Sequence, residues 1–305
     1  MNASDVFFQQ IVNGLTIGMI YALIALGYTI VYGVAQLINF AHGEVFMVGA
    51  HLGLLASVLL QKVAPSFRGS IFDLTNIFLV AMMGCAILGA AIEQFAYRPL
   101  RDAPRLAPLI TAIGVSFLLQ NVVMLIFGPT DKSFPNLIQP KRISLGAVTF
   151  TQLQLTIALV SILLMAVLYL WIKSTRMGKA MRALADDREA ASLMGVNVNR
   201  AVSIAFVIGS ALAGAGGVMF GMYYNTINFH DGYLAGLKAF AAAVLGGIGN
   251  IPGAMLGGVL IGVLESLGAG YLSAEWKNVF AFFILILILL FRPSGLLGSR
   301  AVKKV

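Results

Sequence analysis

Long apolar runs are the feature that most constrains the fold of this 305-residue chain. Seven of them approach the roughly 20 residues that a helix needs to cross the hydrocarbon core of a bilayer. They occupy residues 11–34, 40–61, 76–97, 107–127, 153–172, 201–224 and 276–291. Only 10% of the residues are charged, against about 25% in a typical soluble domain. The period-2 alternation typical of membrane β-barrels does not occur, so we expect an all-α, polytopic integral membrane helical bundle.

A further apolar stretch, near 234–267, is interrupted in its middle. The interruption reads Gly246-Gly-Ile-Gly-Asn-Ile-Pro-Gly253, a cluster of residues that break helices. The stretch is short for two full spans, and irregular backbone at membrane depth is tolerated only where it is buried in protein or lines a cavity. We therefore expect a broken helical hairpin, of short or re-entrant helices, and about 8–9 crossings in all. A cytoplasmic turn between two ordinary short spans is the alternative.

The basic residues between the apolar runs indicate the orientation. Thirteen of the 20 fall in three clusters, at 98–105, 173–200 and 292–304. Cytoplasmic loops carry such an excess of Lys and Arg, so we expect these clusters and the C-terminus inside and the N-terminus outside. The loops 62–75, 128–152 and 225–232 then face outward. We expect residues 1–305 to form a single transmembrane permease domain with a cytoplasmic coupling segment at about 173–200.

The net charge of +8 follows from this topology and does not indicate binding to nucleic acid. Membrane lipid is the expected surrounding of most of the chain, and no nucleic-acid partner is expected.

Residues 177–195 form the longest charge-dense segment with a helical pattern. Their apolar members lie on one helical stripe: Met177, Met181, Leu184, Ala191 and Met194. Acidic and basic residues are mixed on the other faces, whereas a lipid-bound helix is strongly basic. A helix lying on the membrane surface is the alternative, but the pattern favours one short helix that docks into a groove on a protein. The candidate coupling residues are Gly178, Arg182, Asp186, Asp187, Glu189, Ala190, Ala191 and Gly195.

Polar residues also cluster at the start of the second apolar run, at 39–44. One interpretation is structural: Asn39 caps the helix, and the helix dipole favours Glu44 in the first turn. The other is a broken helix start that lines a translocation path, because ionisable groups are costly in lipid and usually mark a pathway or a pair. The candidate path residues are Asn39, His42, Gly43, Glu44, Gly246, Gly247, Gly249, Asn250 and Pro252.

Three more ionisable residues, Glu93, Lys238 and Glu265, lie in or beside apolar runs. They are further candidates for a pathway or a pair, with an interfacial position as the alternative for each. No His, Cys, Asp or Glu grouping has metal-ligand spacing, and no nucleophile stands beside a base in a known motif. We therefore expect neither a metal site nor a catalytic centre, which makes an intramembrane enzyme improbable.

Small residues recur every four positions at Gly209, Ala213, Gly217 and Gly221. They form one smooth helix face that a neighbouring helix can approach closely. This face favours packing inside the chain, and a seam with a second membrane subunit is the alternative.

Three motifs carry a resemblance to a known family. Glu189-Ala-Ala, followed after three residues by Gly195, resembles the EAA---G element of permease subunits of bacterial ABC importers, although the usual Ile-x-Leu-Pro tail is missing. Asn39-Phe-Ala-His-Gly-Glu44, the segment from Gly178-Lys-Ala-Met-Arg182 to Gly195, and the 246–254 turn together resemble the branched-chain amino-acid (hydrophobic amino-acid uptake) permease family. The resemblance runs from about residue 10 to the 292–296 terminus and is nearest to the H-type permease subunit.

The resemblance implies a subunit that moves Leu, Ile or Val by alternating access through the bacterial cytoplasmic (inner) membrane. It further implies a second related permease, two cytoplasmic ATP-binding subunits and a periplasmic or extracellular binding protein that delivers the substrate. The sequence has no GxxxxGK[ST] pattern, so we expect no enzyme activity and no cofactor in this chain, with ATP and Mg bound by the partners. A urea or amide importer is the alternative within the family, and an ATPase-independent secondary transporter is the alternative outside it.

Overall fold

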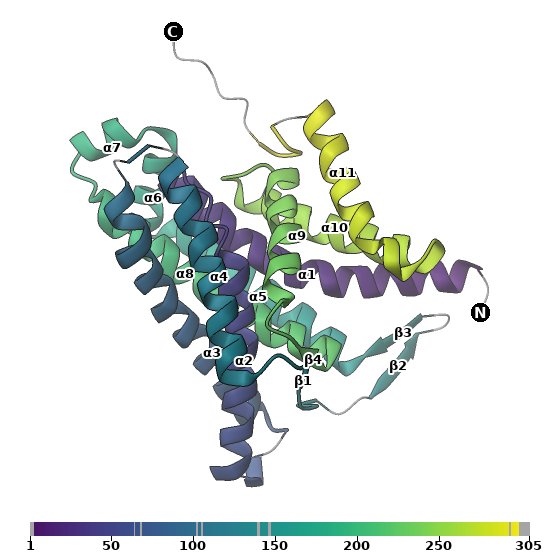
Figure 1. Ribbon diagram of the computed structural model, residues 1–305. Coiled ribbons are helices and arrows are strands. Elements are labelled where there is room, and N and C mark those ends of the chain that lie inside the picture. The colour runs from purple at the N-terminus through teal and green to yellow at the C-terminus, as the bar shows by residue number, and fades with distance from the viewer. Residues whose placement is uncertain are drawn as a thin grey trace.

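The computed structural model of the protein describes residues 3–63, 65–67, 69–101, 103–104, 106–138, 141–145, 148–292 and 294–298. Most of this part of the chain is helical (Figure 1). The helices are α1 (Ala3–Ala35), α2 (His42–Val63), α3 (Ile71–Ile92), α4 (Leu106–Phe127), α5 (Gln152–Ser174), α6 (Arg176–Asp186), α7 (Arg188–Leu193), α8 (Val198–Tyr224), α9 (Asp231–Gly246), α10 (Ile251–Tyr271) and α11 (Lys277–Phe291). The strands are β1 (Lys132–Ser133), β2 (Arg142–Leu145), β3 (Val148–Thr151) and β4 (Thr226–Ile227).

Among the described residues, seven helices are long and apolar enough to cross a membrane: α1, α2, α3, α4, α5, α8 and α10. This finding confirms the predicted polytopic helical membrane fold. Two further helices are shorter, with 16 residues in α9 and 15 in α11. The number of crossings between seven and nine therefore depends on these two helices.

The connections gather on two opposite sides of the bundle (Figure 1). The α3–α4 connection, the helices α6 and α7, the α9–α10 turn and the end of α11 lie on the upper side. The α2–α3 connection and both small strand pairs lie on the lower side. There β1 pairs antiparallel with β4, which joins the loop after α4 to the loop after α8. The Gln9 side chain exchanges hydrogen bonds of 3.0 and 3.1 Å with the backbone of Thr149, so the start of α1 contacts the β2–β3 hairpin.

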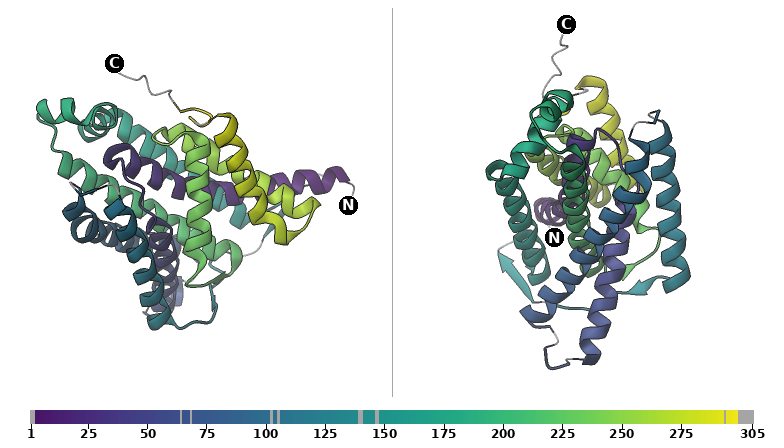
Figure 2. Two further views of the ribbon diagram at one scale, coloured as in Figure 1. Left: turned by 45° about the horizontal axis from the view of Figure 1, so that its top comes forward. Right: turned by 90° about the vertical axis from the view of Figure 1, so that its left-hand side faces the viewer.

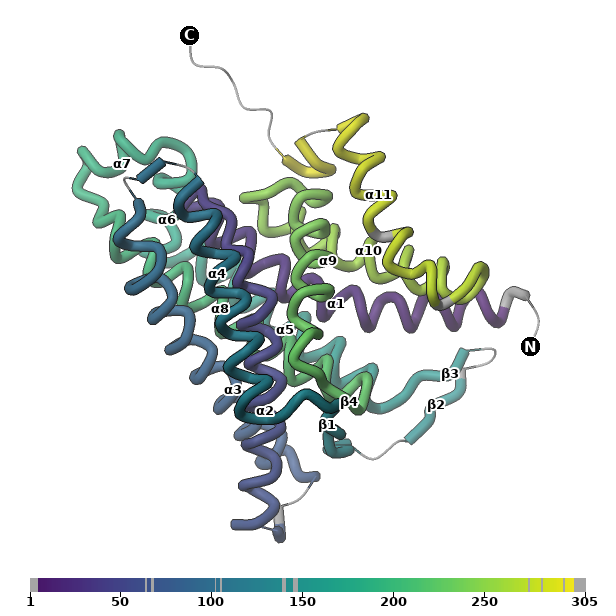
Figure 3. Tube along the Cα trace, viewed as in Figure 1, coloured from purple at the N-terminus to yellow at the C-terminus, as the bar shows by residue number. Residues whose placement is uncertain are grey.

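Helix α1 forms the centre of the bundle. It is seen nearly end-on in the middle of the right-hand view of Figure 2, and the tube in Figure 3 shows it passing behind α9. It packs against α8, α9 and α10, and its residues 20–26 are fully buried. Glycine makes the closest of these contacts possible, because a Cβ atom at Gly258 of α10 would lie 2.4 Å from the Ala22 Cα.

The predicted break in the last apolar stretch is present between α9 and α10. Gly247 (φ +102°) and Gly249 (φ +91°) adopt backbone conformations that side-chain-bearing residues rarely adopt. Asn250 then caps α10 by accepting a hydrogen bond of 3.0 Å from the Gly253 N–H. The expectation of two short helices is right for α9 and wrong for α10, which has 21 residues and is long enough to cross.

Candidate functional site

The polar segment at 177–195 forms two helices, α6 and α7, where the sequence predicted one. The break lies at Asp187, whose backbone is extended (φ −155°, ψ 105°). Its side chain accepts a hydrogen bond of 3.0 Å from the Ala190 N–H and so caps α7. Asp side chains favour caps over helix interiors because they compete for nearby backbone N–H groups. The single-helix prediction was wrong for this reason.

Helix α6 is attached to the end of α5 by two of the predicted coupling residues. A Cβ atom at Gly178 would lie 2.1 Å from the Ile172 carbonyl oxygen, so only glycine fits there. The Arg182 guanidinium donates a hydrogen bond to the same carbonyl. Met181 and Leu184 are buried beneath the helix. Gly178 and Arg182 therefore connect the segment to the membrane-spanning bundle.

Helix α7 presents the exposed part of the segment. Leu193 and Met194 are 88% and 85% exposed, and Glu189 and Ala190 beside them are also exposed. Ala191 is buried and its carbonyl accepts a hydrogen bond of 3.0 Å from the Val196 N–H. Met194 thus leaves the apolar stripe that the sequence predicted, because the break at Asp187 separates α7 from α6.

Gly195 ends the segment with a positive φ of +84°. A Cβ atom there would meet nothing within 4 Å, so the backbone conformation and not crowding calls for glycine. This confirms the predicted C-terminal stop.

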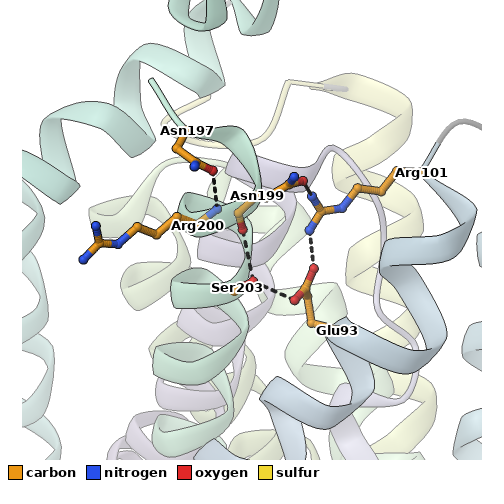
Figure 4. Close-up of polar contacts among 6 residues, drawn as sticks. All are labelled: Glu93, Arg101, Asn197, Asn199, Arg200 and Ser203. Carbon is orange, nitrogen blue, oxygen red and sulfur yellow. Dashed lines mark hydrogen bonds and ion pairs between the residues drawn. The ribbon is translucent and has the colours of Figure 1, made fainter. Parts of the chain in front are cut away.

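A polar cluster ties the start of α8, just after this segment, to the α3–α4 connection (Figure 4). Arg101 forms an ion pair with Glu93 and donates a hydrogen bond to Asn199. The Ser203 hydroxyl donates a hydrogen bond of 2.6 Å to the other Glu93 oxygen. Burial lowers the pKa of Arg101, and the neighbouring Glu93 carboxylate opposes this lowering.

Glu93 itself is only 2% exposed and begins a π-helical turn, Glu93–Tyr97, that follows α3. The sequence made Glu93 a candidate for a pathway or a pair, and the structure pairs it with Arg101. Sequence reasoning missed Asn199 and Ser203, and only their position directly after the coupling segment could have drawn attention to them.

A cavity of about 1610 Å³ opens between the coupling segment and the α9–α10 turn. Arg182 and Asp186 line it from α6, and Gly249, Asn250 and Pro252 line it from the turn. We call this cavity the vestibule. Candidate coupling residues and candidate path residues, which are far apart in sequence, both line it.

Gly246 and Gly247 belong to the backbone of that turn. The residues after α11 cap it: the Leu296 and Leu297 N–H groups donate hydrogen bonds of 2.8 and 3.0 Å to the Leu245 and Gly246 carbonyls. The Asn250 side chain donates a hydrogen bond of 2.7 Å to the Leu297 carbonyl. The last carbonyls of α9 are thus satisfied without water.

The residues at 39–44 lie at buried helix contacts and are not among the residues that line the vestibule. The Asn39 side chain accepts hydrogen bonds of 3.1 Å from the Ala41 N–H and 2.9 Å from the Tyr97 hydroxyl. It therefore closes the turn before α2 and does not cap the helix itself. A Cβ atom at Gly43 would lie 2.4 Å from the Gly232 carbonyl oxygen, so α2 and α9 cross closely there.

His42 and Glu44 are both 1% exposed. His42 packs edge-on against Tyr28, with ring centroids 4.7 Å apart, and neither ring nitrogen has a hydrogen-bond partner among the described residues. One Glu44 oxygen accepts hydrogen bonds of 3.2 Å from Ser116 and 2.7 Å from Gln120, both on α4. A role for these residues in the translocation path stays a prediction.

The small-residue face of α8 is used inside the chain. Gly209 lies against Gly27 of α1, and a Cβ atom at Gly217 would lie 2.3 Å from the Phe46 carbonyl oxygen of α2. Ala213 is fully buried, and Gly221 packs on the Phe134 ring. Of the two interpretations of this face, the structure shows internal packing.

Lys238 of α9 and Glu265 of α10 form an ion pair with an N–O distance of 2.8 Å. They are 4% and 2% exposed, so of the two interpretations that the sequence left open the structure shows a buried pair. The Lys238 ammonium group also lies 3.3 Å from the Tyr21 hydroxyl of α1. Among the described residues no group of three or more His, Cys, Asp or Glu side chains could hold a metal ion.

Comparison with known proteins identifies the family. Residues 10–289 match the model described as branched-chain amino acid transport system, permease component. The chain is 46% identical to the high-affinity branched-chain amino acid transport system permease protein BraD of Pseudomonas aeruginosa, over 98% of both chains. It is 45% identical to the corresponding LivH proteins of Salmonella typhimurium and Escherichia coli K12, again over 98% of both chains. No solved structure matches. The chain belongs to the branched-chain amino acid transport permease family.

Proposed function

We propose that this chain is a membrane-spanning permease subunit of an ATP-driven importer for leucine, isoleucine and valine. The observation that carries the proposal is the 46% identity to BraD over nearly the full length of both chains. The match covers 98% of both chains, which supports a shared transport cycle. The coupling segment also agrees with this proposal, because it is attached to the bundle through α6 and ends in an exposed apolar tip, Leu193 and Met194.

In the proposed cycle the tip of α7 docks into a cytoplasmic ATP-binding subunit. Leu193 and Met194 supply the apolar contact and Glu189 a charged one. Movement of the tip passes to α5 through Gly178 and Arg182 of α6. It passes to α3 and α4 through Asn199 and Ser203 at the start of α8, which are hydrogen-bonded to the Glu93–Arg101 pair. Rearranged spans then open the vestibule to the cytoplasm in alternation with the outer side.

The proposed partners are a second related permease, two ATP-binding subunits and an external binding protein. The chain lacks a phosphate-binding GxxxxGK[ST] loop, so ATP and Mg belong to the partner subunits and the chain itself is not an enzyme. The joined loops at β1 and β4 offer a rigid outer surface for the binding protein. Exposed apolar residues such as Ile87 of α3, Phe117 of α4 and Leu159 of α5 face lipid or the second permease.

The proposed location is the bacterial cytoplasmic membrane. The α6–α7 side, where α11 also ends, faces the cytoplasm, because Arg98, Arg101 and the basic cluster at 173–200 lie in or beside its connections. The start of α1 faces outward, since Gln9 is bonded to the β2–β3 hairpin on the opposite side.

Reconstitution with the partner subunits tests the proposal. Proteoliposomes holding the complete complex should accumulate radiolabelled leucine only when ATP is inside and loaded binding protein is outside. Uptake driven by an ion gradient without the ATP-binding subunits would indicate a secondary transporter. Uptake of urea or a simple amide in place of leucine would indicate the related importer class.

A further inference from the structure

The Lys238–Glu265 pair is a costly feature for the middle of a membrane protein. Each charge must be stripped of water, and their mutual attraction seldom repays that cost in full. Apolar side chains could hold α9 against α10 at least as well. Of the two ion pairs in the described part of the chain, the other, Glu93–Arg101, lies at the end of α3 beside a connection. Lys238–Glu265 instead joins the middle of α9 to the last third of α10.

The hydrogen bonding of this pair is incomplete. One Glu265 oxygen accepts from Lys238, and the other is buried without a hydrogen-bond partner among the described residues. The Lys238 ammonium group has three N–H donors and is within bonding distance of two acceptors, Glu265 and the Tyr21 hydroxyl. The cluster thus offers a free acceptor beside a cation that can still donate.

A free α-amino acid carries the complementary set of groups. At neutral pH it holds an ammonium group and a carboxylate on one carbon, and both charges need partners while the molecule is inside the bilayer. We propose that Lys238, Glu265 and Tyr21 form the transient site for this zwitterion, an inference that rests on the proposed function. The substrate carboxylate binds Lys238 and the Tyr21 hydroxyl, and the substrate ammonium group binds Glu265. When the site is empty, Lys238 and Glu265 satisfy each other.

The position of the pair suits substrate that arrives from outside. Helix α9 begins at Asp231, four residues after β4 on the outer side, and Lys238 lies about 10 Å further along the helix axis. The far end of the same hairpin, at Gly249 and Asn250, lines the vestibule on the opposite side. One hairpin therefore extends from the proposed site to the proposed exit. The glycines with positive φ at its turn give the two arms a place to pivot when the pair separates.

The other buried polar clusters match the zwitterion less well. Glu44 is bonded to the neutral side chains of Ser116 and Gln120, so it offers no cation for a carboxylate. In the Glu93–Arg101 pair both Glu93 oxygens already accept hydrogen bonds. Only the Lys238–Glu265 cluster combines both charges with an unused acceptor among the described residues.

The test uses the double variant Lys238→Met/Glu265→Gln in the complete reconstituted importer. A merely structural pair replaced by uncharged side chains of similar size should leave transport unchanged. The proposed site predicts that the complex still assembles and that loaded binding protein still stimulates ATP hydrolysis. Leucine imported per ATP hydrolysed should nevertheless fall about tenfold or more, the factor expected from losing one charge-assisted hydrogen bond. Ser161→Ala, a buried change between α5 and α8, is the matched control and should import normally.

Leucine import by the double variant at the wild-type ratio to ATP would overturn the site. If the double variant does not assemble, the charge-swapped variant Lys238→Glu/Glu265→Lys decides. If the charge-swapped complex assembles but no longer imports leucine, the result supports the site. If it still imports leucine, or if it also fails to assemble, the pair is structural and the proposed site is overturned. A wild-type complex that imports no leucine would instead contradict the proposed function, so the two failures are distinguishable.

Discussion

The two buried ion pairs in the described part of the chain are built differently. Glu93 and Glu265 are both 2% exposed, and each binds one cation. Both Glu93 oxygens are occupied, by Arg101 and by Ser203, and Arg101 is held a second time by Asn199 (Figure 4). Glu265 keeps one oxygen without a hydrogen-bond partner among the residues that the structure describes.

This difference fits two roles. The Glu93–Arg101 pair suits a fixed connection between helices, and the Lys238–Glu265 pair suits a contact that a ligand can replace. A network in which every group is satisfied has one favoured arrangement and transmits a displacement without rearranging. A pair with spare bonding capacity loses less when it opens to accept a ligand with the same charges. The first pair adjoins the coupling segment, and the second lies in the broken hairpin.

Removing the cation of the hairpin pair should have the largest effect on stability. Lys238→Met leaves the Glu265 charge buried without its partner, which costs about 3–5 kcal/mol of unfolding free energy. Thermal unfolding of the complex in detergent measures the loss. The double variant Lys238→Met/Glu265→Gln should recover most of it, and a double variant as unstable as the single one would contradict the account.

The equivalent change in the cytoplasmic pair should cost less. After Arg101→Met, Ser203 still donates to Glu93, and the site adjoins a connection that water reaches, so we expect about 2–3 kcal/mol. Import per ATP should also fall, because α8 loses its tie to the α3–α4 connection. A stability loss equal to that of Lys238→Met would show that the two pairs are not distinct.

A substitution in α6 tests the coupling segment without changing either ion pair. Gly178→Ala places a methyl group 2.1 Å from the Ile172 carbonyl oxygen, so α6 must shift, at a cost of about 1–3 kcal/mol. Leucine uptake should fall while ATP hydrolysis by the partner subunits continues. Gly114→Ala on α4, where a Cβ atom meets nothing within 4 Å, is the matched control. Equal uptake by both variants would show that the attachment of α6 is not part of the route.

The smallest effect should come from removing one neutral donor. Ser203→Ala takes a single hydrogen bond of 2.6 Å from Glu93 and leaves Arg101 in place, so about 1 kcal/mol is expected. The same thermal measurement detects it. A loss as large as that of Arg101→Met would mean that Ser203, and not the cation, holds Glu93.

Much of the fold could be predicted from local sequence. The apolar run at 107–127 corresponds to α4 (Leu106–Phe127), and the run at 153–172 corresponds to α5 (Gln152–Ser174). The sequence predicts both helices well because the length of a membrane-spanning helix depends only on a run of consecutive apolar residues. The hairpin break was also local, since Gly and Pro act on their own backbone. The interruption at Asp187 was missed because a cap and a helix interior differ by one side-chain hydrogen bond, which the apolar stripe does not reveal.

The sequence by itself determined a helical membrane bundle, the break in its last hairpin, its family and the end of the coupling segment at Gly195. Only the tertiary structure decided which charges meet. Lys238 and Glu265 are 27 residues apart, and Ser203 reaches Glu93 across 110 residues. A buried charge needs a partner within a few ångströms, and helix packing, not spacing along the chain, brings that partner close.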